Sequence, residues 1–294
     1  MFIIFARGFH TSLSMFFKIT SIANLFKMIN SSSQGRLYKV VLFSSFCLCA
    51  IQLATCHIAD IYLDNLLNRC LDGRHHKTKP GPEADLFKQC SPWKDRACCT
   101  EKIAKDLHLA ETWHRFNYSH CAPMSEQCEK FQRQDLCFYE CSPNVGPWLI
   151  PQAKTIRKEY FVGVPFCASE CNAWWDACKD DYTCVEDWGS GFSWTKSGNQ
   201  CPENSTCQTF KKMYGSAKNM CEKIWSDSFQ VKPDNEPCMR LWFDGNGTNP
   251  NEKVAQLKAA EIISASLGGT TRFAVHNILI VIFTLSSLIV PILL

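Results

Sequence analysis

The 294-residue chain lacks the sequence features of nucleic-acid-binding proteins and of several common enzyme classes. Its net charge is only +3 and it contains no run of basic residues, so we expect no nucleic-acid partner. It contains no phosphate-binding glycine loop, no GxSxG and no HExxH. Internal repeats and low-complexity tracts are also missing. Because no nucleophile, base and orienting group can be assembled from motifs, we expect a protein that is not an enzyme.

Cysteine and tryptophan are abundant and lie close together in the sequence. Sixteen cysteines fall between Cys70 and Cys238, and eight of the nine tryptophans fall in the same stretch. So many thiols in a short span indicate disulfides and an oxidising compartment. The tryptophans indicate a second purpose, because flat aromatic walls suit a pocket for a flat ligand.

Other uses of the cysteines fit the sequence less well. Structural zinc sites prefer closely paired cysteines, whereas here the spacings are scattered and one pair, Cys98 and Cys99, is adjacent. A Cys-His nucleophile needs a free thiol, and the count is even. His75 and His76 are interpreted as a solvated turn. We therefore expect no metal site, no catalytic residue and no cofactor.

The N-terminal region has the pattern of a leader followed by a signal peptide. Arg36 and Lys39 precede an apolar stretch that runs to about Ala54, where small residues allow cleavage. We assign residues 1–56 to this leader and signal peptide, with Met28 as an alternative start. A transmembrane anchor is the other interpretation, but the apolar run is short for one.

The C-terminal region predicts a GPI anchor. Residues 278–294 are almost wholly apolar and no basic residue follows them. Small residues and a polar spacer come before this tail, which is the pattern of GPI attachment. We predict attachment at Ser264, with Ser266 and Gly268 as alternatives, in a region and spacer of residues 261–272. The hydrophobic tail of residues 273–294 would then be removed.

The remaining residues, 57–260, form one ectodomain by the usual size of domains. Removal of the signal region takes three of the nineteen cysteines and leaves sixteen, an even number that allows complete pairing. Three N-glycosylation sequons support passage through the secretory pathway to the extracellular face of the plasma membrane. They begin at Asn117, Asn204 and Asn246.

Residues 131–141 have helical spacing with cysteines built in. Cys137 and Cys141 share one helical face, while Asp135 and Tyr139 share another that is free to face a cavity. An aspartate beside two disulfides would be held rigidly, and it can accept two hydrogen bonds from an amidine-like edge of a ligand. The alternative is a solvated helix aspartate.

A second helix is predicted within residues 167–178, where three cysteines again form one stripe. Turn-rich segments separate the other cysteines. The fold class that fits is α+β: a single compact, disulfide-rich, helix-led domain with short strands and about eight disulfides.

A series of motifs resembles the folate receptor family. The resemblance spans residues 70–260 in one order and includes all sixteen cysteines. It implies a GPI-anchored surface receptor that binds folate and takes it up by endocytosis. The motifs are His75–Lys77 with Lys79–Glu83, Cys90–Trp93 with Ala97–Cys99, Arg115–Asn117 before His120–Cys121, Tyr139–Trp148, Trp174–Trp175, Tyr182–Cys184, Ile224–Trp225, Met239–Asp244 and Asn249–Glu252.

The resemblance also implies a disulfide pattern and a set of ligand-binding residues. The implied pairs are Cys70–Cys98, Cys90–Cys137, Cys99–Cys141, Cys121–Cys207, Cys128–Cys178, Cys167–Cys238, Cys171–Cys221 and Cys184–Cys201. The residues that match pterin-binding or aromatic positions are Asp135, Arg157, Ser228, Trp225, Phe116, Trp188 and Trp194. Three further candidates occupy family positions with a changed residue type, namely His114 for a tyrosine, Tyr160 for an arginine and Phe192 for a tryptophan.

The mouth of the expected pocket departs from the family pattern. Ser190 stands where the family has a lysine, Ile156 where it has a tryptophan and Gly189 where it has a histidine. Loss of an ammonium and of an indole N–H weakens the binding of a carboxylate tail. Because the ring-binding positions match the family better than the mouth does, the expected partner is folate or a folate-like pterin. The alternatives are a scaffold that has lost folate binding and recognises another protein, and one that binds another flat ligand such as riboflavin.

Overall fold

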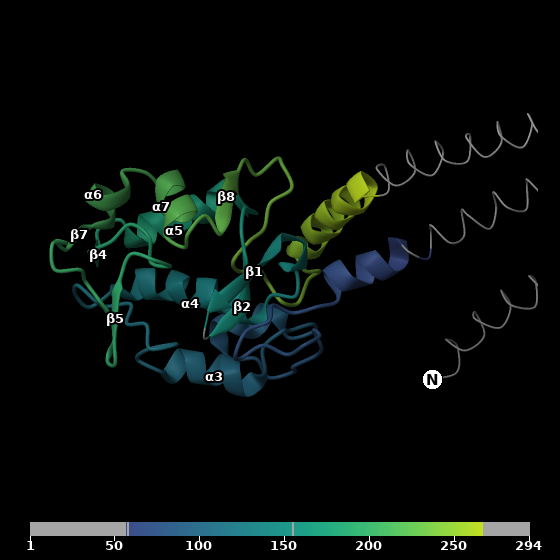
Figure 1. Ribbon diagram of the computed structural model, residues 1–294, viewed down its shortest axis with the longest axis horizontal. Coiled ribbons are helices and arrows are strands. Elements are labelled where there is room, and N and C mark those ends of the chain that lie inside the picture. The colour runs from purple at the N-terminus through teal and green to yellow at the C-terminus, as the bar shows by residue number, and fades with distance from the viewer. Residues whose placement is uncertain (1–56, 58, 155, 267–294) are drawn as a thin grey trace, which may run out of the picture. The chain divides into compact units, whose positions relative to one another are not determined.

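The computed structural model describes residues 57, 59–154 and 156–266 (Figure 1). Two units divide at Asp60, and the fold described below belongs to the unit that begins at Ile61. Helices in the described part of the chain are all too short or too polar to span a bilayer. The predicted leader, the signal peptide and the hydrophobic tail lie outside the described residues.

Helix α4 (Glu126–Cys141) is the central element and lies between α3 (Glu101–Leu109) and α5 (Ala168–Cys178) (Figure 1). The Ser125 hydroxyl accepts a hydrogen bond from the Cys128 amide and so caps the first turn of α4. The helix ends at Cys141, because Pro143 follows. The predicted helix within residues 131–141 is confirmed, but it begins five residues earlier than its predicted first residue, Phe131.

The strands are short and pair in four two-stranded sheets. Three sheets are antiparallel and one, β3–β8, is parallel. This mixture of helices and short strands confirms the predicted α+β class. The strands are β1 (Leu149–Lys154) with β2 (Arg157–Phe161), β3 (Val164–Cys167) with β8 (Phe229–Lys232), β4 (Tyr182–Thr183) with β7 (Gln208–Thr209), and β5 (Ser193–Thr195) with β6 (Gly198–Gln200).

The described fold also contains a helix over residues 61–67, several short helices and one longer helix near its end. The 3-10 helices are η1 (Lys88–Trp93) and η2 (Gly146–Trp148), and two short helices, α6 (Phe210–Tyr214) and α7 (Ala217–Lys223), precede β8. A last helix covers residues 250–266. The predicted attachment residue Ser264 is exposed on that helix.

Eight disulfides hold these elements together. All eight pairs are those implied by the family resemblance, from Cys70–Cys98 to Cys184–Cys201. Two of them join α4 to η1 and to the segment before α3, and a third joins α4 to α5. The helix is therefore anchored on the side that faces away from the cavity described next.

Candidate functional site

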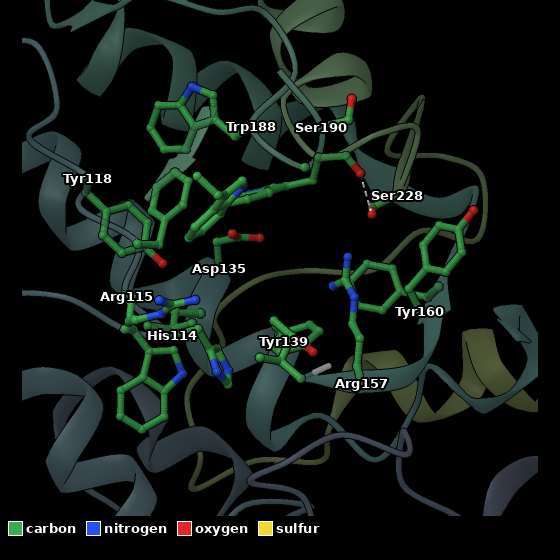
Figure 2. Close-up of a pocket in the computed structure, with 18 of the residues that line it drawn as sticks. His114, Arg115, Tyr118, Asp135, Tyr139, Arg157, Tyr160, Trp188, Ser190 and Ser228 are labelled. Atoms are coloured by element: carbon green, nitrogen blue, oxygen red, sulfur yellow. Dashed lines mark hydrogen bonds between the residues drawn. The ribbon is translucent and has the colours of Figure 1, made fainter. Parts of the chain in front are cut away.

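A cavity of about 590 Å³ opens between α4, the β1–β2 hairpin and three loops (Figure 2). Pockets for drug-sized ligands measure roughly 300–1,000 Å³, so this one can enclose a two-ring heterocycle. The lining is mainly aromatic, with a few polar groups. The lining residues are Trp113, His114, Arg115, Phe116, Tyr118, Asp135, Leu136, Tyr139, Ala153, Ile156, Arg157, Tyr160, Phe161, Trp188, Gly189, Ser190, Trp194, Trp225, Ser228 and Phe229.

Asp135 supplies a buried carboxylate to the cavity. The residue is 6% exposed, and it lies on α4 between the disulfide-bonded Cys128 and Cys137. Burial raises the pKa of Asp135 to about 7, and the nearby Trp225 indole opposes that shift. Trp225 Nε1 makes no hydrogen bond within the described structure, so burial dominates. The cavity therefore presents a carboxyl group that titrates near neutral pH and seeks a donor.

Aromatic rings form the wall beside Asp135. Phe116 is the centre of this wall, with ring centroids 4.9 Å from Tyr118, 5.4 Å from Trp188 and 5.5 Å from Trp225. Trp188 and Trp225 meet edge to face at 5.6 Å, which fixes both indoles. Such a wall suits the face of a flat ring.

Phe192 is the one proposed ligand-binding residue that does not line the cavity. Its side chain is buried behind the wall, 5.4 Å from Phe116 and 4.6 Å from His120 between ring centroids. The expectation for Phe192 is corrected accordingly, because it supports Phe116 from behind. Trp194 and Tyr160, by contrast, both line the cavity.

Arg157 places a cation in the opposite wall. Its Nε donates a 2.9 Å hydrogen bond to Gln152 Oε1, and its guanidinium lies 5.7 Å from the ring centroids of Tyr139 and Tyr160. Burial and the Glu140 carboxylate raise the pKa of Tyr139 to about 12, with Arg157 opposing them. Tyr139 is thus a neutral phenol that can donate to a ligand.

A left-handed turn presents Trp225 and Ser228. Ser226 and Asp227 have φ values of 52° and 59°, a conformation that non-glycine residues seldom adopt. The Ser228 hydroxyl donates a 2.6 Å hydrogen bond to the Trp225 carbonyl. Its oxygen therefore faces a ligand as an acceptor, since its proton is already used.

The rim near Ser190 is built around a carboxylate. Asp187 accepts hydrogen bonds from the Ser190 hydroxyl (2.6 Å), the Ser226 hydroxyl (2.8 Å) and the Gly189 amide (2.7 Å). Gly189 permits this closeness, because a Cβ there would lie 2.3 Å from Ser226 Oγ. The position where the family has a lysine thus adjoins a negative charge.

Behind His114, a buried glutamate collects donors. Trp113 Nε1 donates to Glu140 Oε1 at 2.7 Å, and His114 Nε2 lies 3.0 Å from the same oxygen. Burial alone would raise the pKa of Glu140, but His114, His75 and the charge of His76 hold it well below its usual range. Glu140 is therefore ionised and keeps His114 in the cavity wall.

The interpretation of His75 and His76 as a solvated turn is wrong. The His76 side chain is 2% exposed, and its Nδ1 lies 3.6 Å from Glu140 Oε2. His75 stacks on His114 with centroids 4.7 Å apart and planes 13° from parallel. Both histidines are inner supports of the cavity wall, and the Glu140 carboxylate that draws them inward lies about 65 residues away in sequence, where spacing gives no sign of it.

One cluster of three potential metal ligands in the described part of the chain contains no disulfide cysteine, namely His75, His114 and Glu140. The lone pair of an imidazole lies in the ring plane. Because the His75 and His114 planes are nearly parallel and stacked, their lone pairs do not converge on one point. This arrangement does not fit a metal site, whose ligands must converge.

Nine of the ten residues proposed from sequence line the cavity. Two polar lining residues were missed: Arg115 and Tyr118. Tyr139, four residues after Asp135 on α4, lies in the cavity lining as its helical spacing predicted. Arg115 could not have been found in this way, because the left-handed backbone at His114 and Arg115 breaks any regular alternation.

Comparison with known proteins agrees with this geometry. The model of the folate receptor family matches residues 69–240, more than half of the chain. The chain belongs to the folate receptor family. It is 42% identical over 200 residues to folate receptor gamma of Homo sapiens, covering 67% of this chain and 82% of that protein.

Two other relatives show the breadth of the match. Identity to folate receptor alpha of Bos taurus is 41% over 206 residues, covering 69% of this chain and 86% of that protein. Identity to riboflavin-binding protein of Dromaius novaehollandiae is 33% over 178 residues, covering 58% of this chain and 71% of that protein. The family scaffold is thus shared with proteins whose names refer to two different vitamins.

Proposed function

We propose that the protein is a cell-surface receptor that binds folate or a folate-like pterin and carries it into the cell by endocytosis. The observation that carries the proposal is the buried Asp135 carboxylate, which faces a cavity walled by Phe116, Trp188 and Trp225. A carboxylate paired with an amino–amidine edge forms two charge-assisted hydrogen bonds, as it does with an arginine fork. The pterin ring offers such an edge.

The other lining groups suit the rest of a pterin ring. The flat ring would lie against the aromatic wall, as aromatic pairs prefer. Arg157 can donate to a ring carbonyl, and the Ser228 oxygen can accept from a ring N–H. Ring recognition would thus combine two acceptors, Asp135 and Ser228, with one donor, Arg157.

The cellular location is part of the same proposal. Eight disulfides require an oxidising compartment, and the three sequon asparagines, Asn117, Asn204 and Asn246, are all exposed. The tail pattern supports GPI attachment at or near Ser264. Phosphatidylinositol-specific phospholipase C should release the protein from cells, whereas retention with the tail peptide present would refute the anchor.

Titration calorimetry of the purified protein against folic acid, a reduced folate, pterin and riboflavin tests the proposed ligand class. We expect heat from folic acid and from pterin, because both carry the ring edge that Asp135 would bind. Riboflavin alone giving heat would assign the pocket to a flavin, a second candidate favoured by the riboflavin-binding relative. No heat from any of the four would favour a scaffold that recognises another protein.

A further inference from the structure

The cavity contains two arginines in very different situations. Arg157 is half-buried, hydrogen-bonded to Gln152 and placed against two tyrosine rings. Arg115 is exposed, and its side chain makes one long contact, 3.5 Å from Nη1 to the Thr195 carbonyl. Arg115 takes part in no ion pair with another residue in the described ranges. It is therefore a cation at the cavity rim with its charge uncommitted.

The backbone fixes Arg115 against the β5–β6 hairpin. Gly198 in β6 has a φ of 117°, and a Cβ there would lie 2.2 Å from the Arg115 carbonyl oxygen. Asn199, the next residue in β6, binds the backbone of Asn117, two residues after Arg115. Its Oδ1 accepts a hydrogen bond from the Asn117 amide at 2.7 Å, and its Nδ2 donates one to the Asn117 carbonyl at 3.2 Å. The segment that carries Arg115 cannot move independently of this hairpin.

The same hairpin carries Trp194 at the rim. Trp194 is 49% exposed and lines the cavity, with its ring centroid 6.3 Å from that of Phe116. Its neighbour Thr195 provides the carbonyl that Arg115 contacts. A half-exposed indole and a guanidinium thus come from adjoining segments, and an indole N–H and a guanidinium are both donors to a carboxylate.

The rim near Ser190 carries a negative charge, in contrast to the rim at Arg115. Figure 2 shows Arg115 and Ser190 on different sides of Asp135. Ser190 is bound to the Asp187 carboxylate, and Ile156 adds no polar group. An anionic tail that left the cavity past Ser190 would approach the Asp187 carboxylate, which repels it.

We propose that Arg115, with Trp194 beside it, binds the anionic end of the ligand, so that the tail leaves the cavity along the β5–β6 hairpin. The inference rests on the proposed pterin-ring site and specifies its ligand class as a flat ring conjugated to a carboxylate tail. Arg115 is a specificity residue in this account. It distinguishes a conjugated pterin from the bare ring, whereas Asp135 binds both.

Equilibrium binding of folic acid and of pterin to the full-length protein tests the inference. Arg115→Gln should weaken folic acid binding about tenfold at low salt and leave pterin binding unchanged, because only folic acid carries the tail. Arg115→Lys should retain most of the affinity. The difference between wild type and Arg115→Gln should shrink as sodium chloride is raised, since an exposed ion pair is screened.

A matched control is Lys105→Gln, which removes the same charge from an exposed position on α3 that does not line the cavity. It should bind both ligands as the wild type does. Arg115→Gln protein with wild-type affinity for folic acid would overturn the inference, as would an equal loss of folic acid and pterin. Wild-type protein that binds neither ligand would instead refute the proposed ring site itself.

Discussion

Ser190 donates a 2.6 Å hydrogen bond to Asp187 at the rim of the cavity, and this contact changes what a lysine there could do. An ammonium at position 190 would meet the Asp187 carboxylate before it met a ligand. The missing lysine and the neighbouring aspartate must therefore be considered together when the specificity of this family member is altered.

The first prediction follows from that pair. Ser190→Lys alone should change folic acid affinity by less than about threefold, because Asp187 would pair with the new ammonium. Ser190→Lys combined with Asp187→Asn should strengthen folic acid binding and leave pterin unchanged, because the two changes remove the repulsive carboxylate and add a cation, which opens a second exit for the tail on the Ser190 side. Equilibrium binding of both ligands to the two variants measures this. A full gain from Ser190→Lys alone would show that Asp187 does not capture the lysine.

A second prediction concerns Gly198, where both backbone conformation and space require glycine. Gly198→Ala should lower the thermal unfolding midpoint and weaken folic acid binding, because its Cβ would press on the Arg115 carbonyl at 2.2 Å. Gly215→Ala is the matched control, since φ is 72° there and nothing lies within 4 Å of the added Cβ. It carries only the conformational cost, about 1 kcal/mol. Equal effects of the two changes would contradict the account.

The third prediction concerns Glu140, whose carboxylate is fully buried among its donors. Glu140→Gln should lower the free energy of unfolding by roughly 3–5 kcal/mol at neutral pH, the usual effect of breaking a buried charge pair. The folded pKa of Glu140 is depressed, so its stabilisation is present above the unfolded value, near 4.5, and is lost as pH falls. The difference between wild type and variant should therefore narrow in acid.

Calorimetric unfolding of wild type and Glu140→Gln at several pH values measures this difference. Glu186→Gln is a control, because the Glu186–Lys223 pair is exposed and should contribute less than about 1 kcal/mol. A Glu140→Gln variant as stable as the control would mean that the histidine cluster does not support the cavity wall.

The fourth prediction is that the contribution of Asp135 to stability falls as pH rises, whereas that of Glu140 increases. Burial raises the pKa of Asp135 from 3.8 to about 7, so folding favours its protonated form. The contribution of Asp135 to stability is fully present below pH 3.8 and is lost as pH rises through about 7. Asp135→Asn should thus unfold at an increasingly higher temperature than the wild type as pH rises from 4 to about 8. A difference that does not vary with pH would contradict the raised pKa.

Much of the fold was predictable because local rules and tertiary structure agree. The spacing in residues 131–141 predicted a helix with one face bound by Cys137 and Cys141 and another toward a cavity, and α4 has this arrangement. The even count of cysteines predicted full pairing, and the family resemblance supplied the partners. Neither inference required knowledge of how distant segments meet.

The residues that escaped prediction depend on contacts between distant segments. His76 is buried because Glu140 draws it inward across 64 positions of sequence. Arg115 reaches the cavity rim because a left-handed turn redirects the chain and Gly198 lets a distant strand approach it. Phe192 was expected to bind the ligand, but it packs behind Phe116, since a single substitution from tryptophan does not reveal which way a side chain points.

The most direct test of the central claim is proton release when pterin binds. The claim is that the Asp135 carboxylate grips the ring edge in its ionised form. At pH 6, one unit below a pKa of about 7, roughly nine-tenths of Asp135 is protonated, so binding should release about 0.9 proton and be about tenfold weaker than at pH 8. Titration calorimetry in two buffers of different ionisation enthalpy measures both quantities, with Asp135→Asn expected to bind no pterin. Equal affinity at both pH values without proton release, or wild-type affinity in Asp135→Asn, would contradict the account.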